Sequence, residues 1–583
     1  MSEWLKIINE RKKILGQSEF LFNSETKTEI DATFKLDKES KQNLIICPNC
    51  NEALNGLELS ENNKVCYYCN YHFRINSIER IKLIFDEKDL VLYDEDIISC
   101  DPINFPDYDI KLEKLKDELN INEAVITGKG KISNKEVHFG IMDYRFIMGS
   151  MGAAVGERLT RMIERATKEA KPIIIFSASG GARMQEGIIS LYQMAKVVAA
   201  IEEHSRKGLM YISVLTNPTT GGVMASFASI ADVIIAEPNA TIGFAGKRVI
   251  KNINNDNFIN NCQTSEFHLE SGHIDILCSR RKLKSTIADI IELYIGHSSD
   301  NKSKLNVGII EDMYIVNSSL ANISAWEKVK LARDPNRPNF QDYINNIFDN
   351  FIELHGDRIS NDDKSIVTGI GTINGVHVTA ILNAKGKNLD ENIIRNFGMG
   401  RPEGYRKVVR VARMSEKFGL PVICFVDTPG ADSGIEAEKM GQGYAIANSI
   451  KNFTKLAVPI ISIIIGEGGS GGALAIGVAD WVFILENAIY SIISPEGCAS
   501  ILFKDSSRAE EVAEYLKLTA DELLKLNVVN EIIPESKNGF NIEKEILLNY
   551  IKVKLFNKLV ELLQIDMNTL LMKRREGLRI KGI

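Results

Sequence analysis

The chain has 583 residues, of which 44% are apolar and 25% charged, and its formal net charge is -7. This length and composition predict a globular protein with more than one domain. The acidic balance makes nucleic acid an unlikely general partner, and the absence of any apolar run of membrane-spanning length argues against a membrane protein.

Residues 1–45 are polar and lack the apolar core and cleavage site of a secretory signal peptide. The chain has nine cysteines, four of them in two close pairs, which fits a reducing compartment better than a disulfide scaffold. We therefore expect a cytoplasmic protein whose first 45 residues form a lead-in.

Two cysteine pairs follow. Cys47 and Cys50 are separated by two residues, and after fifteen intervening residues Cys66 and Cys69 repeat that spacing. Two such turns can place four thiolates tetrahedrally around one zinc ion, which leaves no coordination position open. The spacing predicts a zinc ribbon over residues 46–75 with a structural role. The alternative is four unrelated buried thiols.

Residues 76–296 have the pattern of a layered α/β domain. A helical pattern spans residues 77–90, and residues 123–146 alternate like paired antiparallel strands with a turn near Asn134. Small residues then lead into an amphipathic helix. The apolar run Ile173 to Phe176 predicts a buried strand, which Gly180-Gly181 turns into a helix. Such a turn aims unpaired backbone N–H groups at whatever lies above the strand's end.

The order of strand, Gly-Gly turn and helix then repeats along the chain. A strand, YISVLTNP, leads to Gly221-Gly222 and a helix of small residues, and two further strands close this half. Residues 297–323 are rich in Ser and Asn and predict a linker. Residues 324–540 repeat the same order of elements, and 541–583 predict a helical segment.

The spacings support a duplication. Gly181 and Gly222 are 41 positions apart, and Gly430 and Gly472 are 42 apart. Asp232 precedes Gly243 by 11 positions, as Asp480 precedes Ser491. Two units of one architecture are therefore predicted, each with its ligand site at the strand ends.

Several long blocks carry a resemblance to a known family. In the first half these are MGSMGAAVGERLTR, FSASGGARMQEG, LTNPTTGGVMASFA and AEPNATIGFAG; in the second half they are ARDPNRP, ELHGDR, PEGYRK, GEGGSGGALAIG and SPEGCASIL. The chain resembles the carboxyltransferase of bacterial acetyl-CoA carboxylase, with β- and α-subunit sequences joined β first. The resemblance implies two crotonase-like (ββα superhelix) α/β domains in tandem behind the zinc ribbon, and an active site between a β-type and an α-type domain.

The resemblance also implies a reaction and its partners. A carboxyl group would pass from carboxybiotin on a separate biotin carboxyl carrier protein to acetyl-CoA, giving malonyl-CoA. A separate biotin carboxylase would recharge the carrier, and the chain would form at least a homodimer equivalent to α2β2.

Backbone amides of glycine turns are expected to stabilise the two oxyanions of this reaction. The catalytic candidates are Gly180 and Gly181 in one half and Gly468, Gly469, Gly471 and Gly472 in the other. The substrate-binding candidates are Arg183, Gly221, Gly222, Phe244, Ala245, Gly246, Gly430, Ala431 and Lys385. For Arg183, a CoA phosphate and a surface acid are alternative partners. Glu186, Glu467 and Glu496 are expected to be structural carboxylates.

The second half departs from the family's pattern near these turns. Asn383-Ala384 and Lys387 stand where the family has His-Gln and Arg, Gly400-Arg401 replaces Pro-His, and Asp432-Ser433 replaces Tyr-Pro. Two alternatives therefore stay open at this point. One is an enzyme acting on another acyl thioester; the other is a non-catalytic binding protein that uses its zinc ribbon.

Overall fold

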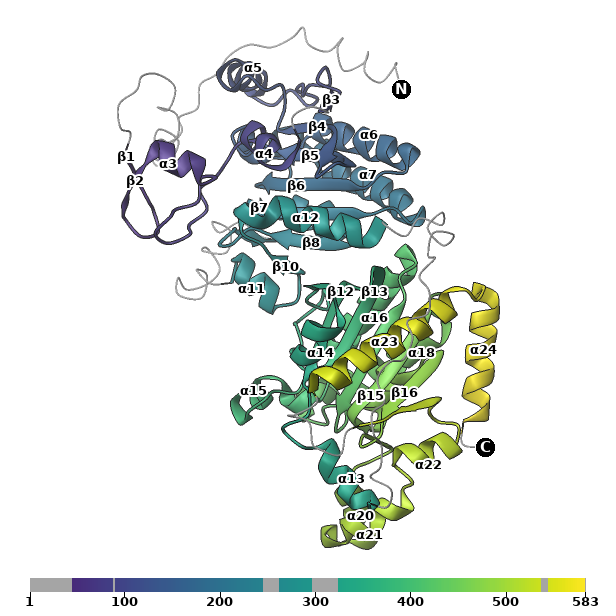
Figure 1. Cartoon of the computed structure of the whole chain (residues 1–583). Helices are drawn as coiled ribbons and strands as arrows, with labels where there is room; N and C mark the ends of the chain where they lie inside the picture. Colours follow the sequence, from purple (N-terminus) through teal and green to yellow (C-terminus); the bar gives the residue numbers. More distant parts are fainter. Residues whose placement is uncertain (1–43, 87–89, 245–261, 296–322, 536–543, 582–583) are drawn as a thin grey trace. The chain divides into compact units, whose positions relative to one another are not determined.

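The computed structural model describes residues 44–86, 90–244, 262–295, 323–535 and 544–581, which form two compact units (Figure 1). Unit 1 contains the described chain up to His268 together with Leu277–Ala288. Unit 2 contains Leu269–Ile276 and the described chain from Asp289 onward. The predicted linker and most of the predicted lead-in lie outside the described residues.

The division into units differs slightly from the predicted one, because two short segments before residue 296 pack into unit 2. Asp275, from the first of these segments, is fully buried and forms ion pairs with Arg358 and Arg410. These two arginines compensate the buried carboxylate and hold the segment in unit 2.

Unit 1 begins with a small ribbon and continues as an eight-stranded sheet with helices. The ribbon elements are β1 (Leu44–Ile46), β2 (Ala53–Asn55) and α3 (Gly56–Glu61). The strands of the sheet are β3 (Val91–Tyr93), β4 (Val125–Ile132), β5 (Lys135–Met142), β6 (Ile173–Ser179), β7 (Tyr211–Thr220), β8 (Val233–Ala236), β9 (Ile242–Gly243) and β10 (Ile276–Leu277), the last of which crosses the boundary between the units. The helices are α4 (Ser77–Ile84), α5 (Tyr108–Leu119), η2 (Ile147–Gly149), α6 (Ala153–Glu169), η3 (Met184–Glu186), α7 (Gly187–Arg206), α8 (Gly221–Met224), η4 (Phe227–Ser229), α11 (Ser265–Glu270) and α12 (Arg280–Ile295), the last two crossing the boundary between the units.

Unit 2 has a second eight-stranded sheet. Its strands are β11 (Asn350–Glu353), β12 (Ile366–Ile373), β13 (Val376–Asn383), β14 (Val422–Thr428), β15 (Ile460–Gly469), β16 (Trp481–Leu485), β17 (Ile489–Ser491) and β18 (Glu531–Ile533). Its helices are α13 (Ala325–Ala332), α14 (Phe340–Ile347), α15 (Leu389–Ile394), η6 (Asn396–Gly398), α16 (Pro402–Phe418), α17 (Ile435–Lys439), α18 (Gln442–Lys455), α19 (Ser470–Gly477), α20 (Pro495–Phe503), η7 (Ser506–Arg508), α21 (Ala509–Tyr515), α22 (Ala520–Lys525), α23 (Lys544–Leu563) and α24 (Met567–Ile580).

The two sheets have the same topology, which confirms the predicted duplication. The strand order is β10-β8-β7-β6-β5-β4-β3 in unit 1 and β18-β16-β15-β14-β13-β12-β11 in unit 2, with β9 and β17 added beside β7 and β15. The first strands are antiparallel, whereas β5 to β8 and β13 to β16 run parallel. The matched aspartates also agree, since Asp232 accepts from the backbone of Tyr211 and Asp480 from that of Ile460.

Burial explains why the central strands read as continuous apolar runs. Every residue of β6 and of β15 is buried, as expected for parallel strands covered on both faces. The helices α6 and α7 pack together in unit 1, and α16 and α18 do so in unit 2. The hairpin between β4 and β5 turns at Ser133 and Asn134, both with positive φ, close to the predicted turn. Among the described helices, none has the length and hydropathy needed to cross a membrane.

Candidate active site

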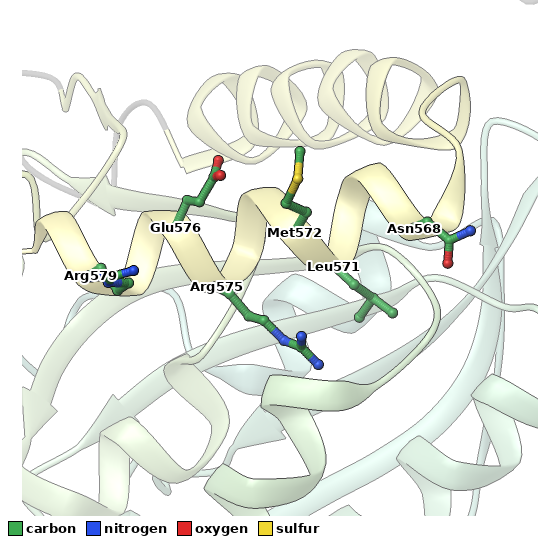
Figure 2. Close-up of a pocket in the computed structure, with 6 residues that line it drawn as sticks. All are labelled: Asn568, Leu571, Met572, Arg575, Glu576 and Arg579. Carbon is green, nitrogen blue, oxygen red and sulfur yellow. The ribbon is translucent and has the colours of Figure 1, made fainter.

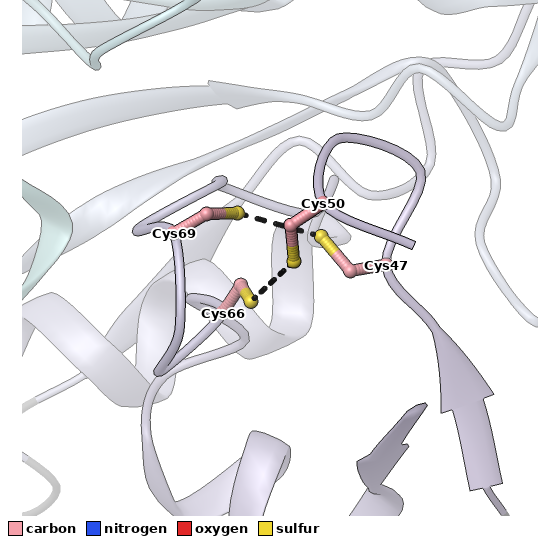
Figure 3. Close-up of side chains that lie close together, drawn as sticks. All are labelled: Cys47, Cys50, Cys66 and Cys69. Atoms are coloured by element: carbon pink, nitrogen blue, oxygen red, sulfur yellow. Dashed lines mark hydrogen bonds between the residues drawn. The ribbon is translucent and has the colours of Figure 1, made fainter. Parts of the chain in front are cut away.

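The four ribbon cysteines come together as their spacing predicts (Figure 3). Two turns of the same kind present them. In each turn the first cysteine's carbonyl accepts from an asparagine N–H four positions later, Asn51 or Asn70, and both asparagines have positive φ. The sulfur atoms of Cys47 and Cys69 are 3.6 Å apart, and those of Cys50 and Cys66 are 3.8 Å apart.

These distances fit a single tetrahedral metal ion. Zinc–sulfur bonds of about 2.3 Å in a tetrahedron place sulfur atoms about 3.8 Å from one another. All four sulfur atoms lie within 4.8 Å of each other. All nine cysteines of the chain are free, so no disulfide competes for these thiols. The cluster is therefore compatible with zinc.

Two glycine turns pack against each other in unit 1, above the ends of β6 and β7. Gly181 has φ +117° and Gly221 has φ +60°, backbone conformations that favour glycine. A Cβ on Gly181 would lie 3.2 Å from the Cα of Gly221 and 3.2 Å from the backbone nitrogen of Gly222. The residues predicted from two separate motifs thus form one site in this unit.

The backbone bonds of this site leave two amides available. The N–H of Gly180 donates to Met148 O (2.8 Å) and that of Gly181 to Ser179 Oγ (3.0 Å). The N–H of Ala182 makes no hydrogen bond to any described residue. On either side of it, Gly181 O accepts from the N–H of Met151 and the N–H of Arg183 donates to Met151 O. Gly222 lies in the first turn of α8, where amides have no partner within the helix, and no side chain caps this helix. The free donors are therefore the amide of Ala182, which follows the predicted Gly181, and that of Gly222, which was itself predicted.

Unit 2 repeats this arrangement. The N–H of Gly430 donates to Thr428 Oγ1 (3.2 Å), as that of Gly181 does to Ser179, and the Ala431 amide has no acceptor among the described residues. Helix α19 begins at Ser470 without a side-chain cap, which leaves the first-turn amides available. Gly469 packs so closely that a Cβ on it would lie 2.1 Å from Pro429 O.

The strand register corrects one detail of the predicted repeat. Ser179 pairs with Thr219 in unit 1, and Thr428 pairs with Gly468 in unit 2. Gly222 lies three residues after Thr219 and Gly471 lies three residues after Gly468, so Gly222 corresponds to Gly471 rather than to Gly472. Gly472 has another role, because a Cβ on it would lie 2.5 Å from the Ala431 nitrogen. The second donor pair is thus Ala431 and Gly471, and Gly472 allows the two turns to approach.

The sequence analysis named Ala431 as a substrate-binding candidate but did not name its counterpart Ala182. The available signal was positional, since Ala182 and Ala431 each follow the glycine with the unusual φ in the two copies of the motif. Gly468 lies in β15 and pairs with Tyr490 of β17.

Charged side chains gather beside the unit 2 turn, at the ends of three adjacent parallel strands. Lys385 donates to Asp427 (2.7 Å) and Glu467 (2.9 Å). Arg333 joins Glu467 (2.7 Å) to Glu496 (2.6 Å). Burial lowers the pKa of Lys385, but the two carboxylates outweigh it and leave that pKa above its ordinary value. This network orders the turn, in agreement with the structural role expected for Glu467 and Glu496.

Arg183 was predicted to contact substrate, but the structure buries its side chain among protein groups. Its side chain is 0% exposed and forms ion pairs with Glu123 (2.6 Å) and Glu186 (3.4 Å), neither of them a surface acid. The guanidinium also donates to Ser99 and to the carbonyl of Ser150. A buried cation needs such partners, so none of its donors is left for a CoA phosphate.

The remaining predicted contacts lie partly outside the described residues. Phe244 is 75% exposed, and its carbonyl accepts from the N–H of Gly221 (2.9 Å), which places the residue beside the unit 1 turns. Ala245 and Gly246 are not among the described residues.

One surface hollow lies elsewhere, on α24 (Figure 2). Its lining residues are Asn568, Leu571, Met572, Arg575, Glu576 and Arg579. These belong to a continuous helix, whose backbone amides beyond the first turn are used within the helix. The hollow therefore offers no counterpart of the two donor pairs.

Comparisons with known proteins point to one family. The family model for acetyl co-enzyme A carboxylase carboxyltransferase-like proteins matches residues 280–582. The acetyl-coenzyme A carboxylase carboxyl transferase subunits beta/alpha of Clostridium tetani is 46% identical over 536 residues, covering 92% of both chains. The protein of the same name from Natranaerobius thermophilus is 45% identical and covers 96% of this chain and 95% of its own.

A solved structure shows the same fold. Transcarboxylase 12S, described with methylmalonyl-coenzyme A bound, superposes with a TM-score of 0.65 at 20% identity, covering 86% of this chain and 92% of that chain. At this identity the likeness concerns the fold alone.

Proposed function

Because the chain belongs to the acetyl-CoA carboxylase carboxyltransferase family, with β and α sequences in one polypeptide, we propose that its two donor pairs carry out the carboxyl transfer. The substrates are a biotin carboxylated on a separate carrier protein and acetyl-CoA, and the product is malonyl-CoA. The observation that carries this proposal is the matched pair of free amides in each unit: Ala182 with Gly222, and Ala431 with Gly471.

The chemistry needs two such sites. Negative charge develops on the thioester oxygen of acetyl-CoA when its α-carbon becomes a nucleophile, and on the ureido oxygen of biotin when the carboxyl group leaves. We assign the thioester oxygen to Ala182 and Gly222 and the ureido oxygen to Ala431 and Gly471. Backbone amides held by tight turns need little reorganisation as charge develops, and one such donor is worth about 10²–10³ in rate.

Carrier-bound carboxybiotin supplies the carboxyl group and, once this has left, a basic ureido group for the α-proton. The protein's own contribution is to bind and orient. Around the unit 2 turn, Lys385 and Arg333 hold Asp427, Glu467 and Glu496 in fixed positions. In unit 1, the buried Arg183 holds Glu123 and Glu186 in fixed positions close to the turn that bears Ala182.

Zinc held by the four cysteines has a structural role in this proposal, since four thiolates leave no open coordination position. Cysteines outside disulfides are typical of a reducing compartment, which supports a cytoplasmic location.

A homodimer completes the proposal, and exposed apolar side chains support it. In unit 1, Ile188, Leu191 and Tyr192 lie on one face of α7 and are 61%, 51% and 68% exposed. In unit 2, Ile435 and Tyr444 of α17 and α18 are 76% and 77% exposed. Such faces are typical of protein interfaces. Light scattering on the purified chain is expected to give twice the mass of one chain; a monomer would contradict this part.

The forward reaction tests the proposal. Carboxylated biotin carrier protein is supplied together with acetyl-CoA, propionyl-CoA or butyryl-CoA, and the carboxylated thioesters are separated by chromatography. The proposal predicts malonyl-CoA as the main product, formed only with the carboxylated carrier. Preference for a longer acyl group would instead support the alternative that the changed residues of the second half alter the substrate.

A further inference from the structure

The unit 2 turn carries an acidic side chain next to the free amide of Ala431. At Oδ2, Asp432 accepts hydrogen bonds from Asn396 Nδ2 (3.0 Å) and Arg401 Nε (3.2 Å). At Oδ1 it accepts from the backbone N–H of Gly434 (2.8 Å). The carboxylate is thus fixed by three donors, and one of them is a charged guanidinium.

The backbone around this carboxylate is also fixed. The N–H of Asp432 donates to Gly400 O (3.0 Å), and Ala431 itself forms a bridge with Gly400. Gln442, 6% exposed, donates from Nε2 to the carbonyl oxygens of both Gly400 and Asp432, each at 2.8 Å. Arg401 therefore starts from a backbone position directly beside the segment that bears the free amide.

The Arg401 guanidinium is held at one end and open at the other. Its side chain is 47% exposed, whereas that of Asp432 is 19% exposed. Its Nε donates to Asp432, and within the described chain Nη1 and Nη2 have no hydrogen-bond partner. Two parallel N–H donors of this kind match the two oxygens of a carboxylate.

Asp363 and Glu403 do not take these donors. Asp363, 5% exposed, accepts the backbone N–H of Arg401 (2.7 Å) and that of Ser365 (2.9 Å). Glu403 lies 4.0 Å from Arg406. Asp432 orients the guanidinium through Nε alone, which leaves the outer edge for a ligand.

We propose that Arg401 is a specificity-determining residue that binds the carboxylate being transferred, with Asp432 as the residue that positions it. This inference rests on the proposed function, because carboxybiotin and malonyl-CoA carry that carboxylate whereas biotin and acetyl-CoA do not. The guanidinium distinguishes the carboxylated from the uncarboxylated partner, next to the amides that hold the adjacent oxyanion.

Binding of the carboxylated and of the uncarboxylated biotin carrier protein to the full chain, measured by calorimetry without acetyl-CoA, separates the roles. Arg401→Gln is expected to weaken binding of the carboxylated carrier about 10–100-fold, the loss typical of one charge-assisted pair, and to leave binding of the uncarboxylated carrier within about twofold. Arg401→Lys keeps the positive charge but lacks the two parallel N–H donors, so its affinity is expected to lie between those of the wild type and Arg401→Gln. Asp432→Asn is expected to weaken binding of the carboxylated carrier by a smaller factor.

Arg508→Gln is the matched control, since Arg508 is 40% exposed and also paired with one carboxylate, Glu511. It is expected to change neither affinity. Equal weakening of both carrier forms by Arg401→Gln would place the guanidinium against another part of the carrier and overturn the proposal, as would no effect on either. If the wild-type chain forms no malonyl-CoA from carboxylated carrier, the proposed function itself fails, a result independent of the variants.

Discussion

Two neighbouring glycines of α19 give opposite predictions for the same substitution. A Cβ at position 472 would lie 2.5 Å from the Ala431 nitrogen, a distance that backbone atoms do not tolerate, so the turn must shift. A Cβ at position 471 meets only Ile446 Cγ2, at 3.6 Å, which is an ordinary contact. Gly472→Ala therefore displaces the Ala431 donor, whereas Gly471→Ala leaves it in place.

The expected magnitudes follow from this difference. Gly472→Ala is expected to lower kcat about 10²–10³-fold, which corresponds to about 2.7–4 kcal/mol of lost oxyanion stabilisation. Gly471→Ala is expected to keep kcat within about threefold and to stabilise the helix by up to about 1 kcal/mol. The assay follows acetyl-CoA release from malonyl-CoA with biotin as acceptor, and thermal unfolding verifies that both variants are folded. Equal kcat values for the two folded variants would refute the reasoning.

Three further predictions concern the supporting structure. Arg183→Met leaves the buried Glu123 carboxylate without its cation and is expected to destabilise unit 1 by about 3–5 kcal/mol, seen as a lower Tm. An unchanged Tm together with weaker CoA binding would instead support the substrate role. Burial raises the pKa of Glu237, but Arg80 and Arg280 outweigh it and hold that pKa well below its ordinary value. The stabilisation that the ionised Glu237 gives the fold is therefore complete above the unfolded pKa of about 4.5 and is lost as the pH falls toward the folded pKa. Glu237→Gln should therefore lower Tm at pH 7 more than at pH 3.5. An equal decrease in Tm at both pH values would contradict this. Removing metal with a chelator should release about one zinc ion per chain and make the ribbon sensitive to proteolysis. Cys66→Ser should likewise lower the zinc content and make the ribbon sensitive. A metal-free chain whose ribbon stays resistant to protease would exclude a structural role for zinc.

Much of the fold follows from patterns that are local in sequence. The continuous apolar runs of β6 and β15 reflect burial on both faces, and the turn near Asn134 reflects the tolerance of asparagine for positive φ. The cysteine spacing similarly sufficed to place four sulfur atoms together. One boundary was wrong: the helix predicted over 77–90 ends at Ile84, and Phe85 has extended backbone.

The site itself depended on contacts between distant segments, which spacing does not reveal. The pairing of Arg183 with Glu123 joins residues 60 positions apart, so a basic residue after a glycine turn was indistinguishable from a ligand contact. In the same way, Arg401 and Asp432 meet across 31 positions. Which amides are free depends on acceptors such as Met148 O and Ser179 Oγ, and these became visible only in the folded chain.

The central claim is that one pair of backbone amides in each unit serves the same reaction. The most direct measurement is biotin-dependent release of acetyl-CoA from malonyl-CoA by the wild-type chain and by Gly181→Ala and Gly472→Ala, one variant for each unit. The claim predicts turnover that requires biotin in the wild type and a loss of about 10²–10³ in kcat in each folded variant. Full activity in either variant, or release that does not depend on biotin, would contradict it.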